Sequence, residues 1–255
     1  MNDIVNYIHK KIDRTPDLAL VLGSGLASLQ NILTNPIVVE YNTIPNYFNT
    51  TVKGHEGKFV FGNFQGKYIL IAVGRFHYYE GLSMEQVGLP IQIFNELGCK
   101  NIIITNSSGC LNSNWNLGDV MIINGHYDFT FRTNSDDPTL FEGDDYYNHS
   151  LIALTLKINP ELRVGKYGWV LGPMYETKAE IQNMKNHGVD AVGMSTIPEV
   201  LMAHHLKINI LALALMSNYA VGLTKDELTH EVVLNNSVKY NKKFELLLID
   251  IISQI

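Results

Sequence analysis

Residues 17–26 read DLALVLGSGL, and this stretch decides how the chain is expected to fold. Its apolar first part, residues 17–22, has the composition of a buried strand, and the glycines that follow predict a turn into a helix over 25–32. Glycine lets the backbone approach an anion, and a helix amino terminus offers free N–H groups. A phosphate-binding turn and an ordinary strand-to-helix turn both fit. A dinucleotide fingerprint does not, because Ser28 stands where a third glycine is needed.

Strand patterns alternate with helical patterns along the whole chain. Apolar runs bounded by glycine and polar turns predict strands at residues 17–22, 57–63, 67–73, 101–106, 118–124, 164–171 and 208–217. Helices are predicted at residues 2–12, 25–32, 83–97, 178–187, 198–206 and 226–254. This order indicates one α/β domain over residues 1–255, with a mixed or parallel central sheet that is covered by helices.

Local signals refine where these helices begin. Three pairs have capping-box spacing: Ser83 with Gln86, Thr177 with Glu180, and Thr196 with Glu199. Pro198 suits a first helical turn, whereas Pro90 predicts a kink in the helix over 83–97 or a later start. The stretch 127–150 is rich in Asp, Asn and Tyr, and we expect a long loop there, of the kind that is often functional or interfacial.

The composition limits which binding partners and which cellular compartment are expected. The 255 residues are 46% hydrophobic and carry a net charge of −6 that is spread along the chain, whereas nucleic acid and anionic membranes require clustered Lys and Arg. Cys99 and Cys110 have neither metal-ligand nor redox spacing, and the amino-terminal stretch lacks an apolar core. The longest apolar run, 208–216, is too short to span a bilayer. We therefore expect a soluble cytoplasmic protein without a disulfide or a bound metal.

The second stretch that could carry chemistry is residues 74–81, GRFHYYEG, which follows the strand predicted at 67–73. If that strand continues, Arg75, His77 and Tyr79 alternate onto one face and place a guanidinium, an imidazole and a phenol in a row. Arg suits bidentate phosphate binding, and His can donate to phosphate oxygens. The alternative is a solvated strand end from which the Arg side chain extends into water.

Two further stretches place polar groups where a strand opens into a helix. In residues 172–177, GPMYET, the Glu176 carboxylate beside the Tyr175 ring could bind and stack on a heterocycle that bears N–H donors; alternatively, its charge could simply stabilise the helix dipole. In residues 192–199, Ser195 could belong to a helix cap or to an anion site. The two strand-to-helix turns that carry both Ser and Gly, at residues 23–26 and 192–199, together with Arg75 and His77 favour one shared oxyanion site.

Three isolated polar residues complete the candidates. Asn218 closes the apolar strand at 208–217, at the carboxyl edge where α/β proteins place ligand-reading groups. His55 lies between two glycines in a loop, where a histidine is more often a surface residue than a ligand. His230 lies near the start of the last helix and could cap it, be exposed or reach a ligand.

Eight motifs, in order along the chain, resemble the trimeric purine nucleoside phosphorylase family. They are GSGL at 23, GHEG at 54, GRFHYYEG at 74, TNSSG at 105, GPMYET at 172, GVDAVGMSTIPEV at 188, SN at 217 and HEVV at 230. The match spans residues 17–233, and only 127–163 match poorly. The resemblance implies a three-layer α/β fold with a mixed, partly closed sheet, a homotrimer or hexamer with active sites near subunit contacts, and phosphorolysis without a metal or organic cofactor.

The resemblance also implies a role for each matching residue. Phosphate would be held by Ser24, Arg75, His77, Ser195 and the backbone N–H of Ser107, with His55 closing over it. The pentose would meet Tyr79, Met194 and His230. The base would lie against Tyr175, with Glu176 taking its N1–H and Asn218 bonding to N7 and O6. The catalytic groups among these would be His77, Glu176 and Asn218.

The implied reaction is the phosphorolysis of inosine, guanosine and their deoxy forms to free base and pentose 1-phosphate, in purine salvage. Such a reaction needs an anion beside an oxocarbenium-like sugar and a donor for the leaving purine. Two departures from the family pattern stand out. Ser107, Ser108 and Cys110 replace the usual alanines and glycine, and the added hydroxyls could alter phosphate affinity. The region after Asp128 is shortened, so the aromatic normally lent across the subunit contact has no clear match there, and Phe141 is a candidate for it.

Other functions compete with this interpretation. Relatives of methylthioadenosine phosphorylase place an acid where Asn218 stands, and a carboxylate favours a 6-amino group, whereas an amide can serve a 6-oxo group. A catalytically silent nucleoside-binding or assembly protein could use the same scaffold, although every phosphate and base position carries a competent side chain. The chain has no HExxH, GxSxG or P-loop pattern, which disfavours zincins, α/β-hydrolases and NTPases. The incomplete glycine motif disfavours a nicotinamide oxidoreductase.

Overall fold

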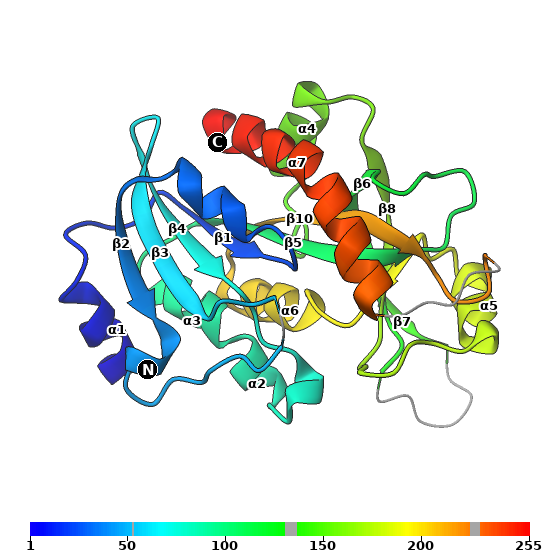
Figure 1. Cartoon of the computed structure of the whole chain (residues 1–255), viewed down its shortest axis with the longest axis horizontal. Helices are drawn as coiled ribbons and strands as arrows, with labels where there is room; N and C mark the ends of the chain where they lie inside the picture. The colour runs from blue at the N-terminus through cyan, green and yellow to red at the C-terminus, as the bar shows by residue number, and fades with distance from the viewer. Residues whose placement is uncertain (53, 131–136, 225–229) are drawn as a thin grey trace.

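A computed structural model describes residues 1–52, 54–130, 137–224 and 230–255, and only the backbone of residues 230–235 and 237. Ten strands of this described part form one sheet (Figure 1). They are β1 (Leu18–Leu22), β2 (Thr34–Glu40), β3 (Lys58–Phe64), β4 (Lys67–Val73), β5 (Asn101–Cys110), β6 (Val120–Asp128), β7 (Thr139–Glu142), β8 (Arg163–Trp169), β9 (Ala191–Gly193) and β10 (Asn209–Tyr219).

One half of the sheet closes on itself. The strand order β10-β6-β8-β9-β5 is completed by a long parallel pairing of β10 with β5, from Asn209 opposite Asn101 to Tyr219 opposite Cys110. The order continues from β5 through β1, β4, β3 and β2 as an open extension, and β7 pairs with β6. Strands β6, β8 and β9 run parallel, whereas β5 and β9 are antiparallel. This mixed, partly closed sheet confirms the predicted fold class.

Helices cover both faces of the sheet (Figure 1). They are α1 (Asn2–His9), α2 (Met84–Val87), α3 (Leu89–Glu96), α4 (His149–Ile158), α5 (Lys178–Asn186), α6 (Ile197–Leu206) and α7 (His230–Gln254), with short 3-10 helices η1 (Ala27–Ile32), η2 (Tyr41–Thr43) and η3 (Tyr78–Glu80). One core cluster joins α1, α3 and α6 to the sheet, and another joins η1, α4 and α7 to its opposite face. The three expected layers are therefore present.

Strand β1 shows how the sequence builds these two cores. Because successive side chains of a strand point to opposite faces, Ala19 and Val21 pack in one cluster while Leu18, Leu20 and Leu22 pack in the other. All five residues are buried. A strand that is covered on both faces reads as a continuous apolar run, which is the pattern that residues 17–22 show.

Several local expectations hold and several are wrong. The capping boxes at Ser83 and Thr177 form, and the helix predicted over 83–97 is broken at Gly88 just before Pro90. The helix predicted over 25–32 is instead the short 3-10 helix η1. Strand β2 and helix α4 were not expected, and the stretch 127–150 contains β7 rather than loop alone. No helix among the described residues is long and apolar enough to cross a membrane.

Candidate active site

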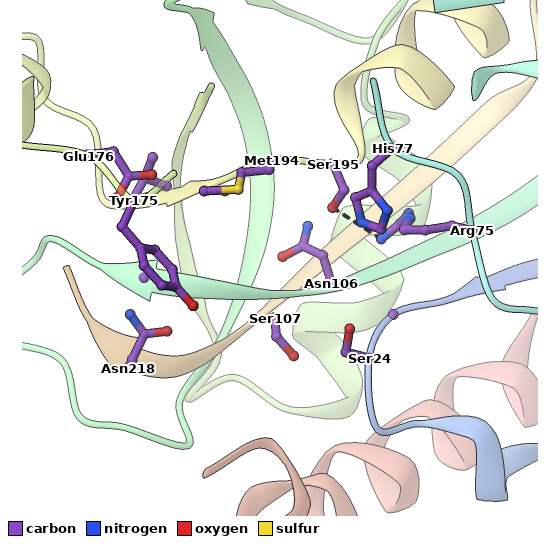
Figure 2. Close-up of a pocket in the computed structure, with 14 residues that line it drawn as sticks. Ser24, Arg75, His77, Asn106, Ser107, Tyr175, Glu176, Met194, Ser195 and Asn218 are labelled. Carbon is purple, nitrogen blue, oxygen red and sulfur yellow. Dashed lines mark hydrogen bonds between the residues drawn. The ribbon is translucent and has the colours of Figure 1, made fainter. Parts of the chain in front are cut away.

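The carboxyl ends of several strands meet around one pocket. Strands β4, β1, β5 and β10 run parallel, so the segments that follow them, or that form their last residues, lie at the same edge of the sheet. The pocket is lined from six stretches: residues 23–24, Arg75 with His77, residues 106–109, Tyr175 with Glu176, residues 192–195 and Asn218. Figure 2 shows Ser24, Arg75, His77 and Ser195 at one end and Tyr175, Glu176 and Asn218 at the other. Eight of the predicted residues from the two ends thus line one cavity: Ser24, Arg75, His77, Ser107, Ser195, Tyr175, Glu176 and Asn218.

Gly23 lets the end of β1 pack directly against β5. A Cβ atom at this position would lie 2.8 Å from the Asn106 Cα and 2.8 Å from the Thr105 carbonyl oxygen, so any larger residue would push the strands apart. The Gly23 N–H donates to the Thr105 Oγ1 at 2.9 Å. This close approach brings Ser24 beside Ser107 in the pocket wall (Figure 2).

Arg75 is buried and held on two sides. Its Nε and Nη2 donate to the two carboxylate oxygens of Glu199, and its Nη1 donates to the Thr105 carbonyl at 2.5 Å and to the Ser195 Oγ at 3.4 Å. The Glu199 charge offsets that of Arg75, so the local charge of the pair is close to neutral. The capping box predicted for Thr196 with Glu199 is therefore wrong, because this carboxylate turns inward to the guanidinium instead.

Glu199 is a site residue that the sequence alone did not reveal. It lies in α6 among apolar residues, on the face that is buried against the sheet. A buried carboxylate needs a charged or hydrogen-bonding partner, and the same holds for a buried arginine. An acid within the apolar stretch IPEVLMA was thus the available signal, but the sequence did not say that Arg75 would meet it.

His77 is oriented by Glu80. Its Nδ1 lies 3.2 Å from the Glu80 Oε1, and its backbone N–H donates to the same oxygen at 2.7 Å. The Glu80 Oε2 accepts from the backbone N–H and the hydroxyl of Thr51, both at 2.8 Å. Burial alone would raise the pKa of Glu80, but these hydrogen bonds outweigh it and lower the pKa to about 2. The ionised carboxylate only accepts, so His77 donates through Nδ1.

Strand alternation is not what brings Arg75 and His77 together. Strand β4 ends at Val73, and the φ of +118° at Gly74 turns the chain away from the line of the strand before these residues. Tyr79 stacks on the His77 ring at 4.8 Å between centroids and does not itself line the pocket. The predicted row of three side chains on one strand face is therefore wrong, although Arg75 and His77 do reach the pocket.

His55 lies behind His77. Their ring centroids are 5.4 Å apart, and the His55 Nε2 has no hydrogen-bond partner among the described residues. Burial, together with the charges of His77 and Arg75, lowers the pKa of His55 to about 3, so this ring is neutral near physiological pH. A Cβ on Gly74 would lie 2.9 Å from the His55 Cβ, so this glycine allows the loop to pack here. His55 is outside the pocket wall itself.

The opposite end of the pocket combines a ring, a carboxyl and an amide. Tyr175 and Glu176 follow Gly172, whose φ of +72° and close contact with Met194 leave no space for a side chain. Burial raises the pKa of Glu176 above its ordinary value, and the neighbouring charge of Glu180 adds to the effect. The Thr177 cap that follows confirms that α5 begins directly after this acid.

Asn218 is aimed by an irregularity in β10. The pairing of β10 with β5 shifts register between Met216 and Asn218, and such bulges redirect side chains next to active sites. The Ser217 hydroxyl donates to the Asn218 Oδ1 at 2.9 Å, while the Asn218 Nδ2 donates to the Tyr219 carbonyl at 3.1 Å. The amide is thereby fixed with its oxygen towards Ser217.

The remaining predicted residues are Met194, His230 and Phe141, and the structure places them differently. Met194 lines the pocket between its two ends (Figure 2). His230 begins α7, but its side chain lies outside the described residues. Phe141 lies on β7 and stacks on His126 of the same chain, with the ring centroids 5.0 Å apart, so its proposed contact across a subunit boundary stays a prediction. Asn106 lines the pocket and was not predicted. Among the described residues, no group of His, Cys, Asp or Glu side chains is arranged to hold a metal ion.

A mixed sheet that is half closed, with a polar pocket at its strand ends, is typical of an α/β protein that binds a small molecule. A family model described as Phosphorylase superfamily matches residues 17–253. The chain is similar to purine nucleoside phosphorylase 1 of Bacillus subtilis (strain 168), at 36% identity over 97% of this chain and 96% of the relative. It is also similar to purine nucleoside phosphorylase of Bos taurus, at 31% identity over 95% of this chain and 90% of the relative.

The solved structures that resemble this chain are also purine nucleoside phosphorylases. The crystal structure of Schistosoma mansoni purine nucleoside phosphorylase in complex with inosine matches with a TM-score of 0.88 at 30% identity, covering 100% of this chain and 95% of the other. The same protein in complex with adenosine matches equally, at a TM-score of 0.88. The chain belongs to the phosphorylase superfamily, within its purine nucleoside phosphorylases, which are pentosyltransferases.

Proposed function

We propose that this protein catalyses the phosphorolysis of 6-oxopurine nucleosides, inosine and guanosine with their deoxy forms, in cytoplasmic purine salvage. Inorganic phosphate is the co-substrate, and no metal or organic cofactor takes part. The observation that carries the proposal is that Arg75 and His77 line the same pocket as Glu176 and Asn218, with Met194 between them. One cavity thus offers an anion end and a purine end at opposite sides of a space for the sugar.

Phosphate is proposed to bind at the end formed by Ser24, Ser107 and Ser195. Serine hydroxyls and the Arg75 and His77 nitrogens are hydrogen-bond donors that suit its oxygens. The Arg75 charge is offset by Glu199. Recognition therefore depends on aimed donors more than on net charge, and fixed dipoles of this kind stabilise an anion without reorganising. His55 is proposed to close over the anion from behind His77.

The pentose is proposed to lie against Met194, with Tyr79 and His230 near its hydroxyls. Tyr79 is stacked on His77, so a sugar in contact with this ring would also lie next to the phosphate. The phosphate oxygen forms a bond to C1′ as the bond from C1′ to N9 breaks, and the bonding electrons leave with the purine. The bound anion stabilises the positive charge that develops on the sugar.

The purine is proposed to stack on Tyr175 between Glu176 and Asn218. A 6-oxopurine has a hydrogen on N1, which the Glu176 carboxylate can accept, and acceptor atoms at O6 and N7 that the Asn218 amide can serve. Adenine has a lone pair on N1 instead, so the ionised carboxylate would face it without a proton between them. This difference is the physical basis of the proposed preference for 6-oxopurines.

The direct test is an initial-rate assay with inosine, guanosine, adenosine and methylthioadenosine, each with and without phosphate. The proposal expects release of hypoxanthine and guanine only when phosphate is present, with formation of pentose 1-phosphate and poor turnover of adenosine. Comparable turnover of adenosine or methylthioadenosine would refute the 6-oxopurine preference. Cleavage that continues undiminished without phosphate, or binding of nucleosides without any cleavage, would refute phosphorolysis.

The proposed assembly is a homotrimer, with a hexamer as the alternative. It is supported by the resemblance to trimeric enzymes, and Phe141 of β7 is the candidate for the aromatic residue lent to a neighbouring subunit. Light scattering coupled to size-exclusion chromatography measures the mass directly, and a monomer would contradict the proposed assembly.

A further inference from the structure

A chain of three buried polar residues runs from the pocket wall, where Asn106 lies, to Thr196 at the start of α6. The Ser108 hydroxyl donates to the Asn106 Oδ1 at 2.5 Å, and the Asn106 Nδ2 donates to the Thr196 Oγ1 at 2.7 Å. The exposed fractions of these residues are 2%, 2% and 0%. We call Ser108, Asn106 and Thr196 the relay. None of the roles proposed above uses it.

The last member of the relay has an unfavourable backbone conformation. Thr196 has a φ of +75° and a ψ of −48°, and the Ile197 N–H donates to the Ser195 carbonyl at 2.9 Å across it. This is a γ-turn with positive φ, which is rare and strained, and a β-branched residue there is an outlier. Strained residues persist only where surrounding contacts hold them, and they cluster at ligand sites.

The turn determines where Ser195 lies. The Ser195 Oγ is 3.4 Å from the Arg75 Nη1 and 3.4 Å from the Thr196 Oγ1, and it lines the pocket. If Thr196 relaxed to negative φ, the backbone on its amino-terminal side would rotate and Ser195 would leave this position. The same change would move the start of α6, which carries the Glu199 partner of Arg75. Two groups of the anion end therefore depend on one strained residue.

We propose that Ser108 and Asn106 are positioning residues that hold the Thr196 turn and so set the affinity for phosphate. The inference rests on the proposed phosphate site. An amide has one acceptor side and one donor side, so the Ser108 hydroxyl on the Asn106 oxygen directs the amide NH2 towards Thr196. The resemblance to the family leads us to expect alanine at position 108. The added Ser108 hydroxyl therefore acts on the anion end through Asn106 and Thr196, and not through contact with the anion.

Steady-state kinetics with phosphate and inosine varied separately test this role. Ser108→Ala removes the first donor, and Thr196→Val removes the acceptor while keeping the branched shape. Each is expected to raise the KM for phosphate by about five- to tenfold, the effect of one lost buried hydrogen bond, while the KM for inosine at saturating phosphate changes by less than about twofold. Thr196→Ser keeps the hydroxyl and is expected to retain the phosphate KM. Titration of inorganic phosphate into the free protein should show the same order of affinities.

A matched control separates positioning from general loss of stability. Thr155→Val removes another fully buried threonine hydroxyl, which donates to the Leu151 carbonyl in α4 far from the pocket. It is expected to lower the melting temperature without changing either KM. Unchanged phosphate KM in Ser108→Ala and Thr196→Val, or equal increases in both KM values, would overturn the proposal. If Thr196→Val does not fold, Ser108→Ala alone decides. Wild-type cleavage that ignores phosphate would instead refute the proposed function.

Discussion

Arg75 and Glu199 form a two-point ion pair in the interior of the protein, with Nε 3.0 Å from Oε1 and Nη2 2.8 Å from Oε2. Each side chain is 1% exposed. The two residues are 124 positions apart in sequence. Their pairing ties the segment after β4 to the start of α6, across the end of β5, and it presents the remaining guanidinium edge to Thr105 and Ser195. The Arg75–Glu199 contact therefore both shapes the anion end of the pocket and stabilises the fold.

Glu199→Gln should destabilise the protein strongly. The substitution keeps the size of the side chain but leaves the Arg75 charge buried without a counter-charge, so the free energy of unfolding is expected to fall by about 3 kcal/mol. Urea unfolding near neutral pH measures the change. Glu142→Gln is the control, because Glu142 pairs with Lys166 at the surface and its loss should cost less than about 1 kcal/mol. Equal effects of the two substitutions would contradict this account of the buried pair.

Asn218→Asp should shift substrate preference towards 6-aminopurines. A carboxylate can accept from the amino group of adenine, but it would face the O6 and N7 acceptors of hypoxanthine unfavourably. The ratio of kcat/KM for inosine to that for adenosine is expected to fall by about 10²-fold. Asn114→Asp makes the same charge change on the surface and should leave the ratio as it is. An unchanged ratio in Asn218→Asp would show that this amide does not read position 6.

Glu176 should produce an acid limb in the pH profile of kcat/KM for inosine. The proposed role needs the ionised carboxylate, and burial raises its pKa, so activity is expected to be lost as pH falls through a value above the usual carboxyl pKa of about 4.3. Glu176→Gln should lower kcat/KM near neutral pH by about 10²-fold and flatten that limb. An acid limb that persists unaltered in the variant would assign the titration to another group.

Glu80 should stabilise the protein in a pH-dependent way. Its hydrogen bonds to His77 and Thr51 lower its pKa to about 2, so the folded state favours the ionised form. That contribution is complete above the ordinary carboxyl pKa and is lost as pH falls towards the lowered value. Glu80→Gln is expected to reduce the free energy of unfolding near neutral pH by about 1–2 kcal/mol, discounted for solvent screening, with a smaller deficit at lower pH.

Urea unfolding at several acidic pH values checks the Glu80 prediction. Glu85→Gln provides the control, because Glu85 is exposed on α2 and should show little effect at any of these values. A deficit in Glu80→Gln that stays constant, or grows, as the pH is lowered would contradict the proposed origin of its stabilising effect.

The sequence predicts strands β1, β4 and β10 well, because each is an apolar run that is buried on both faces. It does not predict β2, where Pro36 and exposed polar residues hide an edge strand, or the short β7. Helix α4 was also missed, since only Leu151 and Thr155 of its ten residues are buried and its apolar period is therefore weak. An element can be predicted from the sequence when its buried residues recur in the regular pattern of a helix or a strand.

The site residues likewise fall into two groups, those that the sequence predicts and those that it does not. Arg75 and Asn218 could be predicted because each follows or closes an apolar strand, and Glu176 because it directly precedes a helix cap beside an aromatic ring. Each of the three has a side chain suited to a ligand. The partner of Arg75 could not, since the spacing of Thr196 and Glu199 fits a local cap as well as it fits an inward-facing carboxylate. The relay could not be predicted either, because it depends on a positive φ at a threonine, which no residue preference indicates.

A crystal structure of the protein with inorganic phosphate and hypoxanthine would show whether one pocket holds phosphate and purine at opposite ends. We expect an anion within hydrogen-bond distance of Ser24, Arg75 and Ser195, and a purine stacked on Tyr175 with N1 facing Glu176 and O6 facing Asn218. Phosphate or hypoxanthine bound in a different cavity, or a purine that leaves Glu176 and Asn218 without a contact, would refute the proposed site.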